Sequence, residues 1–290
     1  MNTPNSSAPT RRSFLAGVGL APLAAGSNAS PVAPAGGVKV VDIHGHLRHH
    51  SDPNWMQSDR AVIDACDKLG IDQTCCSILT PRRPSTPDGF RQCNQWVYEA
   101  MQRFPGRVRG YCYVNPGYRE ALDEVRRCIG RGFFGVKLYN EYLISEPVLY
   151  PLVELSIELG IPILEHAGHP GWLDSAQPRI SDGSAFAEIA KRYPEATIIC
   201  AHICGGGDWE WEIKALRNSP SIFLDTAGSV ADEGVVEKAV ETLGVDRIVF
   251  ACDMSFTTSV GRLRSANLSQ ADKDKIYGLN FQRILSRRKA

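Results

Sequence analysis

The sequence has no excess of charge of either sign, because 32 lysines and arginines are matched by 32 aspartates and glutamates among its 290 residues. A chain without net charge generates no overall field that would attract nucleic acid or an anionic membrane surface. We therefore expect no nucleic acid partner. Any selectivity for charged molecules must come from charges placed locally, as in a site for a small-molecule substrate.

The sequence also lacks the Cys-x-x-Cys pairs of a structural zinc site, although it contains nine cysteines. An odd number of cysteines, in a chain long enough to form a full apolar core, argues against a framework of disulfides. Most of these cysteines lie inside apolar, strand-like runs, where a free thiol behaves as a small apolar side chain. We predict that they are buried and reduced.

The N-terminal 35 residues differ in pattern from the rest of the chain. Residues 10–15 read Thr-Arg-Arg-Ser-Phe-Leu, and a mildly apolar run at 15–25 and then small residues and proline follow. This order is typical of a signal peptide, and the arginine pair indicates the twin-arginine export route. The alternative is an N-terminal tail that contains two arginines by chance.

The apolar run of this segment is too short for a membrane-spanning helix, which needs about 20 apolar residues, so we expect no stable membrane insertion. We predict a signal peptide and linker at residues 1–35, with cleavage after Ala29 or after Ala35. The precursor would be a partner of the twin-arginine export machinery, and the mature chain would be periplasmic or otherwise exported. The sequence leaves homo-oligomerisation open.

From residue 38 onward, short apolar runs alternate with longer amphipathic segments. The runs expected to form strands are 38–44, 71–79, 108–115, 133–140, 161–167, 196–202, 221–226 and 248–253. The segments with helical spacing of apolar residues are 60–69, 91–104, 119–129, 148–159, 185–193, 209–216, 235–243 and 271–285. Several of these segments stop at Gly or Pro, as helices commonly do.

Apolar strands that alternate with helices are typical of a parallel sheet covered by helices. Eight such units in residues 36–290 match the usual size of a (β/α)8 TIM barrel, about 250 residues. The competing architecture is a doubly wound open sheet, which usually has fewer strands and a glycine-rich phosphate loop after the first. Here the first strand continues into His-Gly-His instead. We predict an α/β fold, a single (β/α)8-barrel domain over residues 36–290.

The histidines share one position relative to the predicted strands: each lies at or just after a strand's C-terminal end. They are His44, His46, His49, His50, His166, His169 and His202. In such barrels the C-terminal face carries the active site, because its loops converge over one pocket. A single histidine at a strand end is more often structural than a ligand, but the whole set on one face indicates a functional centre.

His44 and His46 are separated by one residue, so on a strand their side chains point the same way and can share one ion. Asp42 has the same phase and could orient one of them, or a neighbouring group, as an outer carboxylate. Further motifs close later strands: Glu165-His166-Ala-Gly at the fifth, Ala-His202 at the sixth and Ala-Cys-Asp253 at the eighth.

In the order and spacing of these motifs, the chain resembles the amidohydrolase superfamily, and within it the amidohydrolase-related branch that includes decarboxylases and lactonases. The resemblance covers the mature chain, including Gly-Val-Lys137-Leu and the closing segment 280–285. It implies that His44, His46, His166 and Asp253 bind one divalent ion, commonly Zn²⁺, with water in an open position.

Such an ion can lower the pKa of bound water to about 7. On this resemblance His202 would be the proton shuttle or the group that polarises the substrate, and Asp253 would both bind metal and accept a proton. Lys137 has two interpretations. It could be carboxylated and bridge a second ion, or it could be an ammonium paired with a substrate carboxylate or an internal acid, which we favour because a buried ammonium needs an anionic partner.

Further candidates for substrate contact lie in the loops after the first four strands and in two later aromatic positions. They are Arg48, Arg82, Arg83, Asn115, Tyr139, Asn140, Trp172 and Trp209. Arginines there suit the bidentate recognition of a carboxylate. For Arg82 and Arg83, solvated loop charge is an equal alternative.

Two enzymatic interpretations share this site. The main one is a metal-dependent hydrolase that activates water against a small lactone, amide or ester, with a carboxylate on the substrate. The alternative is a non-oxidative decarboxylase or hydratase, a lyase of a small unsaturated or aromatic acid. A non-catalytic periplasmic binding barrel is disfavoured, because it would need neither an open water position nor the additional His202.

The export hypothesis predicts the behaviour of one double variant. Arg11→Lys combined with Arg12→Lys should leave the precursor in the cytoplasm, because the arginine pair is what the export route recognises. Fractionation of the producing cells, followed by immunoblotting, measures this. Delivery equal to that of the unaltered chain would contradict the twin-arginine interpretation.

Overall fold

A computed structural model of the chain describes residues 37–48, 52–78, 80, 83–168, 179–203, 209–228 and 232–289. All of them belong to one compact unit, residues 33–290. The signal-peptide prediction falls outside the described residues and stays a prediction.

Eight strands form, and each overlaps one of the eight predicted runs. They are β1 (Val41–Leu47), β2 (Gln73–Ile78), β3 (Val108–Tyr113), β4 (Gly135–Leu138), β5 (Ile163–Glu165), β6 (Ile198–Cys200), β7 (Ile222–Asp225) and β8 (Ile248–Val249). All neighbouring strands pair in parallel, in the order β1 to β8.

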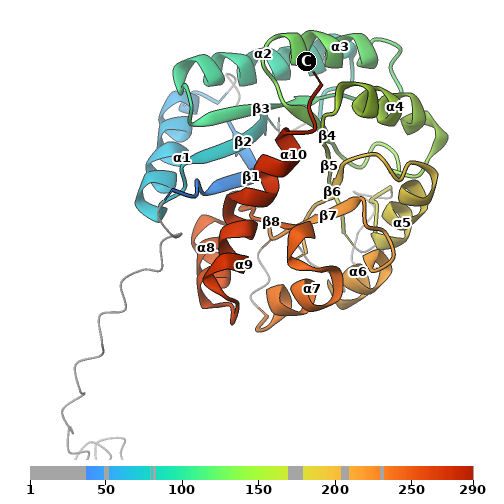
Figure 1. Ribbon diagram of the computed structural model, residues 1–290. Coiled ribbons are helices and arrows are strands. Elements are labelled where there is room, and N and C mark those ends of the chain that lie inside the picture. The colour runs from blue at the N-terminus through green and yellow to red at the C-terminus, as the bar shows by residue number, and fades with distance from the viewer. Residues whose placement is uncertain are drawn as a thin grey trace, which may run out of the picture. The chain divides into compact units, whose positions relative to one another are not determined.

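The sheet closes on itself between its first and last strands. The Ile43 N–H donates to the Phe250 carbonyl (3.0 Å), and the Asp253 N–H donates to the His44 carbonyl (2.7 Å). Figure 1 looks along this ring of strands, with helices around it. The predicted (β/α)8 TIM barrel is therefore confirmed.

The helices that cover the strands are α1 (Trp55–Leu69), α2 (Pro87–Arg103), α3 (Ala121–Gly130), α4 (Tyr150–Leu159), α5 (Gly183–Arg192), α6 (Trp209–Leu216), α7 (Val235–Leu243) and α8 (Phe256–Ser265). The chain ends with α9 (Gln270–Asp274) and α10 (Asn280–Leu285). Predicted glycine stops are confirmed at Gly70 and Gly160, which adopt left-handed backbone angles (φ 74° and 65°) after α1 and α4.

Two helical features differ from the sequence prediction. Helix α8 was not predicted, because its Phe-Thr-Thr-Ser-Val-Gly start has poor helix propensity; it forms with Val260 and Leu263 buried. The predicted single helix 271–285 is divided by a π-helical segment, Lys275–Leu279. Within that segment, a Cβ on Gly278 would lie 2.0 Å from the Lys39 carbonyl oxygen, so only glycine allows this approach.

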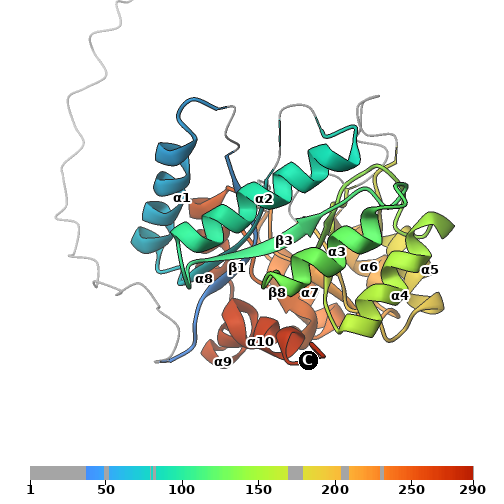
Figure 2. The ribbon, with the colours of Figure 1, turned by 90° about the horizontal axis from the view of Figure 1, so that it is seen from above.

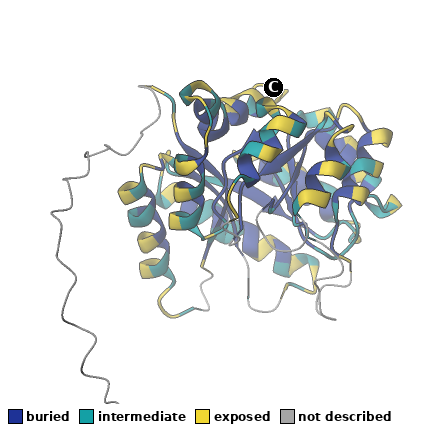
Figure 3. Ribbon diagram, turned by 90° about the horizontal axis from the view of Figure 1, so that it is seen from below, coloured by how far each residue is buried: buried dark blue, intermediate teal, exposed yellow. Residues whose placement is uncertain are grey.

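The apolar core has two layers. One fills the barrel with alternate strand residues such as Ile43, Tyr111 and Leu164, and the other lies between the strands and the helices. Figure 3 shows the strands buried and the exposed residues on the outer faces of the helices. All eight cysteines in the described part of the chain are free and buried, as predicted; Cys204 lies outside it.

Helix α10 closes the end of the barrel opposite the loops that follow the strands. Figure 2 shows α9 and α10 together at that end. Phe281 packs edge-on against Phe134 inside the barrel, with ring centroids 5.3 Å apart. This end therefore serves stability, and the other end is open to function. Among the described residues, no helix is long and apolar enough to cross a membrane.

One buried amide ties α10 to the strands. The side-chain nitrogen of Asn280 donates to the carbonyls of Val245 and Ile248, each at 2.8 Å. Asn280→Ala should lower the free energy of unfolding by about 2 to 3 kcal/mol, because it leaves both carbonyls without this donor. Urea unfolding measures this, with Asn267→Ala at an exposed site as control. If the two variants have equal free energies of unfolding, the Asn280 hydrogen bonds do not stabilise the fold.

Candidate metal centre

The His-Gly-His sequence lies at the end of β1, where the register to β2 shifts between Asp42 and Gly45. A Cβ on Gly45 would lie 2.3 Å from the Thr74 hydroxyl oxygen, so the residue between the two histidines must be glycine. The rings of His44 and His46 end up 5.3 Å apart, centroid to centroid, and nearly perpendicular. The predicted convergence of these two side chains is therefore present.

Each of these rings is oriented by a partner at its Nδ1 atom. His44 Nδ1 lies 2.8 Å from an Asp225 carboxylate oxygen at the end of β7. His46 Nδ1 lies 3.2 Å from the Ser77 hydroxyl at the end of β2. With Nδ1 engaged in this way, each histidine presents its Nε2 to a common point.

The carboxylate of Asp253, which follows β8, completes the cluster. Its Oδ1 lies 2.9 Å from His46 Nε2 and 3.8 Å from His44 Nε2. One potential ligand atom from each of the three residues lies within 4.8 Å of the other two. Two imidazoles whose other nitrogen is engaged, together with one carboxylate, are a donor set that fits a divalent transition metal with positions left open.

His166 and His202 face each other beside this cluster. His202 Nε2 lies 3.0 Å from His166 Nδ1, and His202 Nδ1 lies 3.5 Å from Asp253 Oδ2. If Nδ1 of His166 donates, both contacts are satisfied and His166 keeps a lone pair on Nε2, the form that a ligand needs. His166 is not among the three clustered ligands, so its role as the fourth ligand stays a prediction.

Asp225 also holds the backbone of the site. Its Oδ1 accepts hydrogen bonds from the N–H groups of His202 (2.8 Å) and Ala227 (2.9 Å). His202 (φ 68°) and Asp253 (φ 42°) both adopt left-handed backbone angles, which are costly for residues other than glycine and are often found at functional sites. The bond from Asp225 to the His202 N–H helps to hold this conformation.

Asp42 does not orient an imidazole, which was one role expected of it. Its carboxylate accepts from the backbone N–H groups of His44 (3.1 Å) and Cys252 (2.8 Å), and from the Thr74 hydroxyl (2.9 Å). Burial raises its pKa to about 7, against the effect of these bonds. It therefore fixes the backbone of β1 to the chain after β8.

Burial dominates the titration of the other groups. It lowers the pKa of His202 to about 3 and that of Lys137 to about 8, and it holds the pKa of His44 well below the ordinary range. Burial would raise the pKa of Asp253, but the nearby His44, His46 and His202 lower it below its usual value. At neutral pH the imidazoles of His44 and His202 are therefore neutral, while Asp253 is ionised.

Lys137, on β4, lies deep in the same centre. Its Nζ is 3.1 Å from His44 Nε2 and 4.8 Å from the ring centroid of Tyr139. The charges of Asp253, Asp225 and Glu165 favour its protonated form and oppose the effect of burial. The pairing of Lys137 with an internal acid or a substrate carboxylate stays a prediction.

Tyr139 forms a wall of the centre, with its ring 5.4 Å from that of His166 and 6.5 Å from that of His46. Arg83, in the loop after β2, stacks on the same ring with its guanidinium carbon 4.5 Å from the centroid. The Arg83 side chain also donates to the Asn140 side chain. Arg83 is therefore in contact with Tyr139 and Asn140 while its side chain is exposed, and its role in substrate binding stays a prediction.

Two other candidates have hydrogen bonds to residues outside the three clustered ligands. Arg48 is exposed after β1, with its backbone N–H bonded to Asp59 (2.8 Å). Trp209 donates from its indole to Asp232 (2.8 Å) at the start of α6. Trp172, Arg82, His49, His50 and His169 lie outside the described residues.

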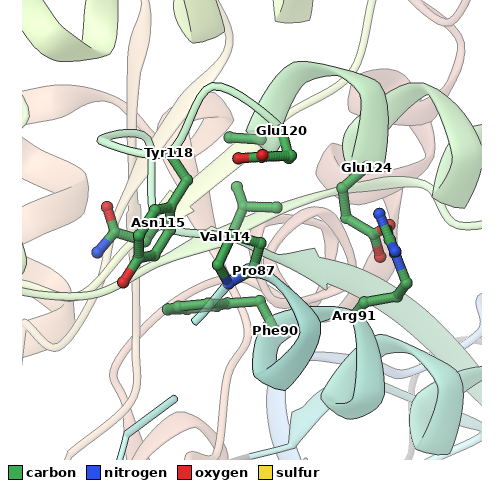
Figure 4. A pocket seen from close by; sticks show the side chains of 9 residues that line it. Pro87, Phe90, Arg91, Val114, Asn115, Tyr118, Glu120 and Glu124 are labelled. Atoms are coloured by element: carbon green, nitrogen blue, oxygen red, sulfur yellow. Dashed lines mark hydrogen bonds and ion pairs between the residues drawn. The ribbon is translucent and has the colours of Figure 1, made fainter. Parts of the chain in front are cut away.

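Asn115 lines a separate pocket between α2 and the end of β3, shown in Figure 4. The view places Phe90, Val114 and Tyr118 in its middle, with Arg91 beside Glu124 at one end. Asn115 Oδ1 accepts from the Gly117 N–H (2.8 Å). None of the three clustered ligand residues lines this pocket.

Sequence reasoning missed Asp225 and Ser77. Asp225 ends the apolar run Ile-Phe-Leu-Asp of β7, the same signal that pointed to Asp253 after β8. Ser77 carries no comparable signal, because serine is common at strand ends and in turns.

Comparison with protein families shows that the chain belongs to the Amidohydrolase family, whose profile matches residues 41–287. A comparison with curated proteins finds no match. The chain is thus a metal-dependent enzyme, as the sequence predicted.

Several solved structures resemble the barrel. A dihydroxybenzoic acid decarboxylase from a Polaromonas species, with bound manganese and 2-nitroresorcinol, is 18% identical (TM-score 0.66; 87% of this chain, 98% of that chain). A manganese-containing 5-carboxyvanillate decarboxylase from Novosphingobium aromaticivorans is 16% identical (TM-score 0.67; 86% and 96%). A 4-oxalomesaconate hydratase from Rhodopseudomonas palustris is 19% identical (TM-score 0.64; 86% and 96%). At these identities the likeness demonstrates the fold.

The ligand assignment predicts metal loss in two variants. His46→Ala and Asp253→Asn should each lose most of the bound metal, because each removes one of three clustered donors, whereas Asp88→Asn on the exposed start of α2 should not. Metal per folded chain is measured by elemental analysis, with circular dichroism to check the fold. Full metal content in both site variants would show that the ligands are wrongly assigned.

Proposed function

We propose that this enzyme is a metal-dependent lyase that removes a carboxylate without oxidation from a small hydroxylated aromatic or unsaturated acid. Two of the three similar structures described above are named as decarboxylases of aromatic acids, and the third as a hydratase. This favours the lyase alternative over the hydrolase that was the main expectation from the sequence. The same metal centre would serve either reaction. The residues that contact the substrate must therefore determine whether the enzyme acts as a lyase or as a hydrolase.

The observation that carries the proposal is the buried ammonium of Lys137 beside the metal-binding His44. A buried cation next to a site for a divalent ion needs anions to balance it. A substrate carboxylate bound beside Lys137 would supply one. Arg83, whose guanidinium carbon lies 4.5 Å from the centroid of the Tyr139 ring, adds a second cation at the same ring.

We propose that the cluster of His44, His46 and Asp253, with His166, holds one divalent ion. Both Zn²⁺ and Mn²⁺ suit imidazole and carboxylate donors, and the similar decarboxylases contain manganese. When bound, such an ion would polarise substrate oxygens as a Lewis acid. If Lys137 were carboxylated and bridged a second ion, each chain would bind two ions instead of one.

The protein's own groups account for the proton that decarboxylation requires. The bond between the ring carbon and the carboxylate breaks, CO₂ leaves, and the electron pair that remains on the carbon takes up a proton. His202 lies between His166 and Asp253, so it can give its Nδ1 proton to the Asp253 carboxylate while its Nε2 takes up a proton from the side of His166. Asp253, which is 28% exposed, would deliver that proton to the carbon, and solvent would replace it through His166. Lys137 and Tyr139 orient the acid against these groups.

We also keep export by the twin-arginine route as a proposal. Within residues 10–35, an arginine pair is followed by an apolar run and then by small residues, and this order supports the proposal. A barrel that binds its ion before translocation would suit a route that carries folded proteins.

Replacement of His202 separates a proton carrier from a metal ligand. His202→Asn should keep the metal content of the unaltered enzyme, because the three clustered donors remain, and should lower turnover by roughly 10² to 10⁴. Asparagine also tolerates the left-handed backbone at this position. Elemental analysis and CO₂ release from hydroxybenzoates, on the same preparation, measure both effects.

Three outcomes of this experiment would change the conclusion. Halved metal content in His202→Asn would make His202 a ligand of a second ion. Unchanged turnover would make it structural. Hydrolysis of lactones or esters by the unaltered enzyme, without CO₂ release from any of the acids, would replace the lyase with the hydrolase.

A further inference from the structure

Arg83 is held at the mouth of the metal centre by three neighbours from the end of β4. Its guanidinium stacks on Tyr139, donates to the Asn140 side chain and lies 3.6 Å from a Glu141 carboxylate oxygen. Glu141 is itself fixed, because it accepts from the Tyr113 hydroxyl (3.1 Å). The arginine is thus oriented before any ligand arrives, which reduces the entropy lost on binding.

The guanidinium keeps one edge for a ligand. Within the described part of the chain, its two polar contacts, to Asn140 and Glu141, both use Nη1. The edge formed by Nε and Nη2 makes no such contact there, and the side chain is 36% exposed. Two parallel N–H groups on one edge match the two oxygens of a carboxylate.

Arg83 and Lys137 contact the same tyrosine ring but differ in depth. The Lys137 Nζ is fully buried beside His44, whereas the Arg83 guanidinium reaches solvent. Two cations at different depths along one aromatic wall fit a planar acid with two anionic groups, one at the reaction centre and one toward the mouth.

We propose that Arg83 forms a subsite for a second carboxylate, so that the preferred substrates are dicarboxylic acids with an aromatic or unsaturated core. The inner carboxylate is the one lost in the proposed function, on which this inference rests. The outer carboxylate stays on the product and pairs with the Nε and Nη2 edge of Arg83. Glu141 balances the charge of Arg83 while the subsite holds no acid.

Binding of unreactive acids tests the subsite without turnover. The probes are isophthalate and benzoate, which share a ring and one carboxylate and differ in the second. Calorimetry on the chain loaded with Mn²⁺ should find tighter binding of isophthalate. Arg83→Gln should weaken isophthalate roughly 10- to 100-fold, the usual range for losing hydrogen bonds to a charged group, and should leave benzoate nearly unchanged.

Two further variants sharpen the test. Arg83→Lys keeps the charge without the planar fork, so it should recover only part of the lost affinity. Arg131→Gln is the matched control, because Arg131 also stacks on a tyrosine, Tyr98, at 3.6 Å, but belongs to the C-terminal end of α3. It should bind both probes as the unaltered chain does.

The subsite would be refuted by equal affinity of the unaltered chain for both probes, by binding of neither, or by equal weakening of both in Arg83→Gln. Failure of the proposed function has a different signature. If no acid releases CO₂ but the preference for isophthalate depends on Arg83, the subsite stands and the reaction assignment does not.

Discussion

The metal centre depends on the carboxylate of Asp225. One of its oxygens orients the ring of His44, and the other accepts from the backbone N–H groups of His202 and Ala227. This one buried group joins β1, β7 and the chain after β6, and it turns His44 Nε2 toward Asp253. A carboxylate that orients a metal-binding histidine also fixes its tautomer and raises its basicity.

Burial of Asp225 raises its pKa, while the bonds from His202 and Ala227 and the charges of His202 and Lys137 act in the opposite direction. Removal of any one partner would leave a buried polar group with fewer bonds, which is costly in an apolar barrel. The site is therefore a connected set of groups, in which Asp42 anchors the backbone and Asp225 anchors both backbone and side chain. Left-handed backbone at His202 and Asp253 is the conformational cost of this arrangement.

The second organising element is the ring of Tyr139. The rings of His46 and His166 lie beside the Tyr139 ring. The cations of Lys137 and Arg83 contact the same ring, Lys137 deep in the centre and Arg83 near solvent. Cations favour the negative face of an aromatic ring, so Tyr139 can hold two of them near each other. In the proposed function this wall would supply selectivity for acids, through local charge in a chain whose net charge is zero.

The sequence by itself determined the alternation of eight strands with helices, the face on which the histidines gather and the shared direction of His44 and His46, whereas Asp253 joined them only through the family resemblance. These features depend on periodicity and on short spacing, which are readable along one chain. Only the tertiary structure decided that Asp225 rather than Asp42 orients His44, that His166 pairs with His202, and that Arg83 stacks on Tyr139. Those contacts join different strands and loops of a closed barrel, and their distances follow from strand register and closure, which no local pattern encodes.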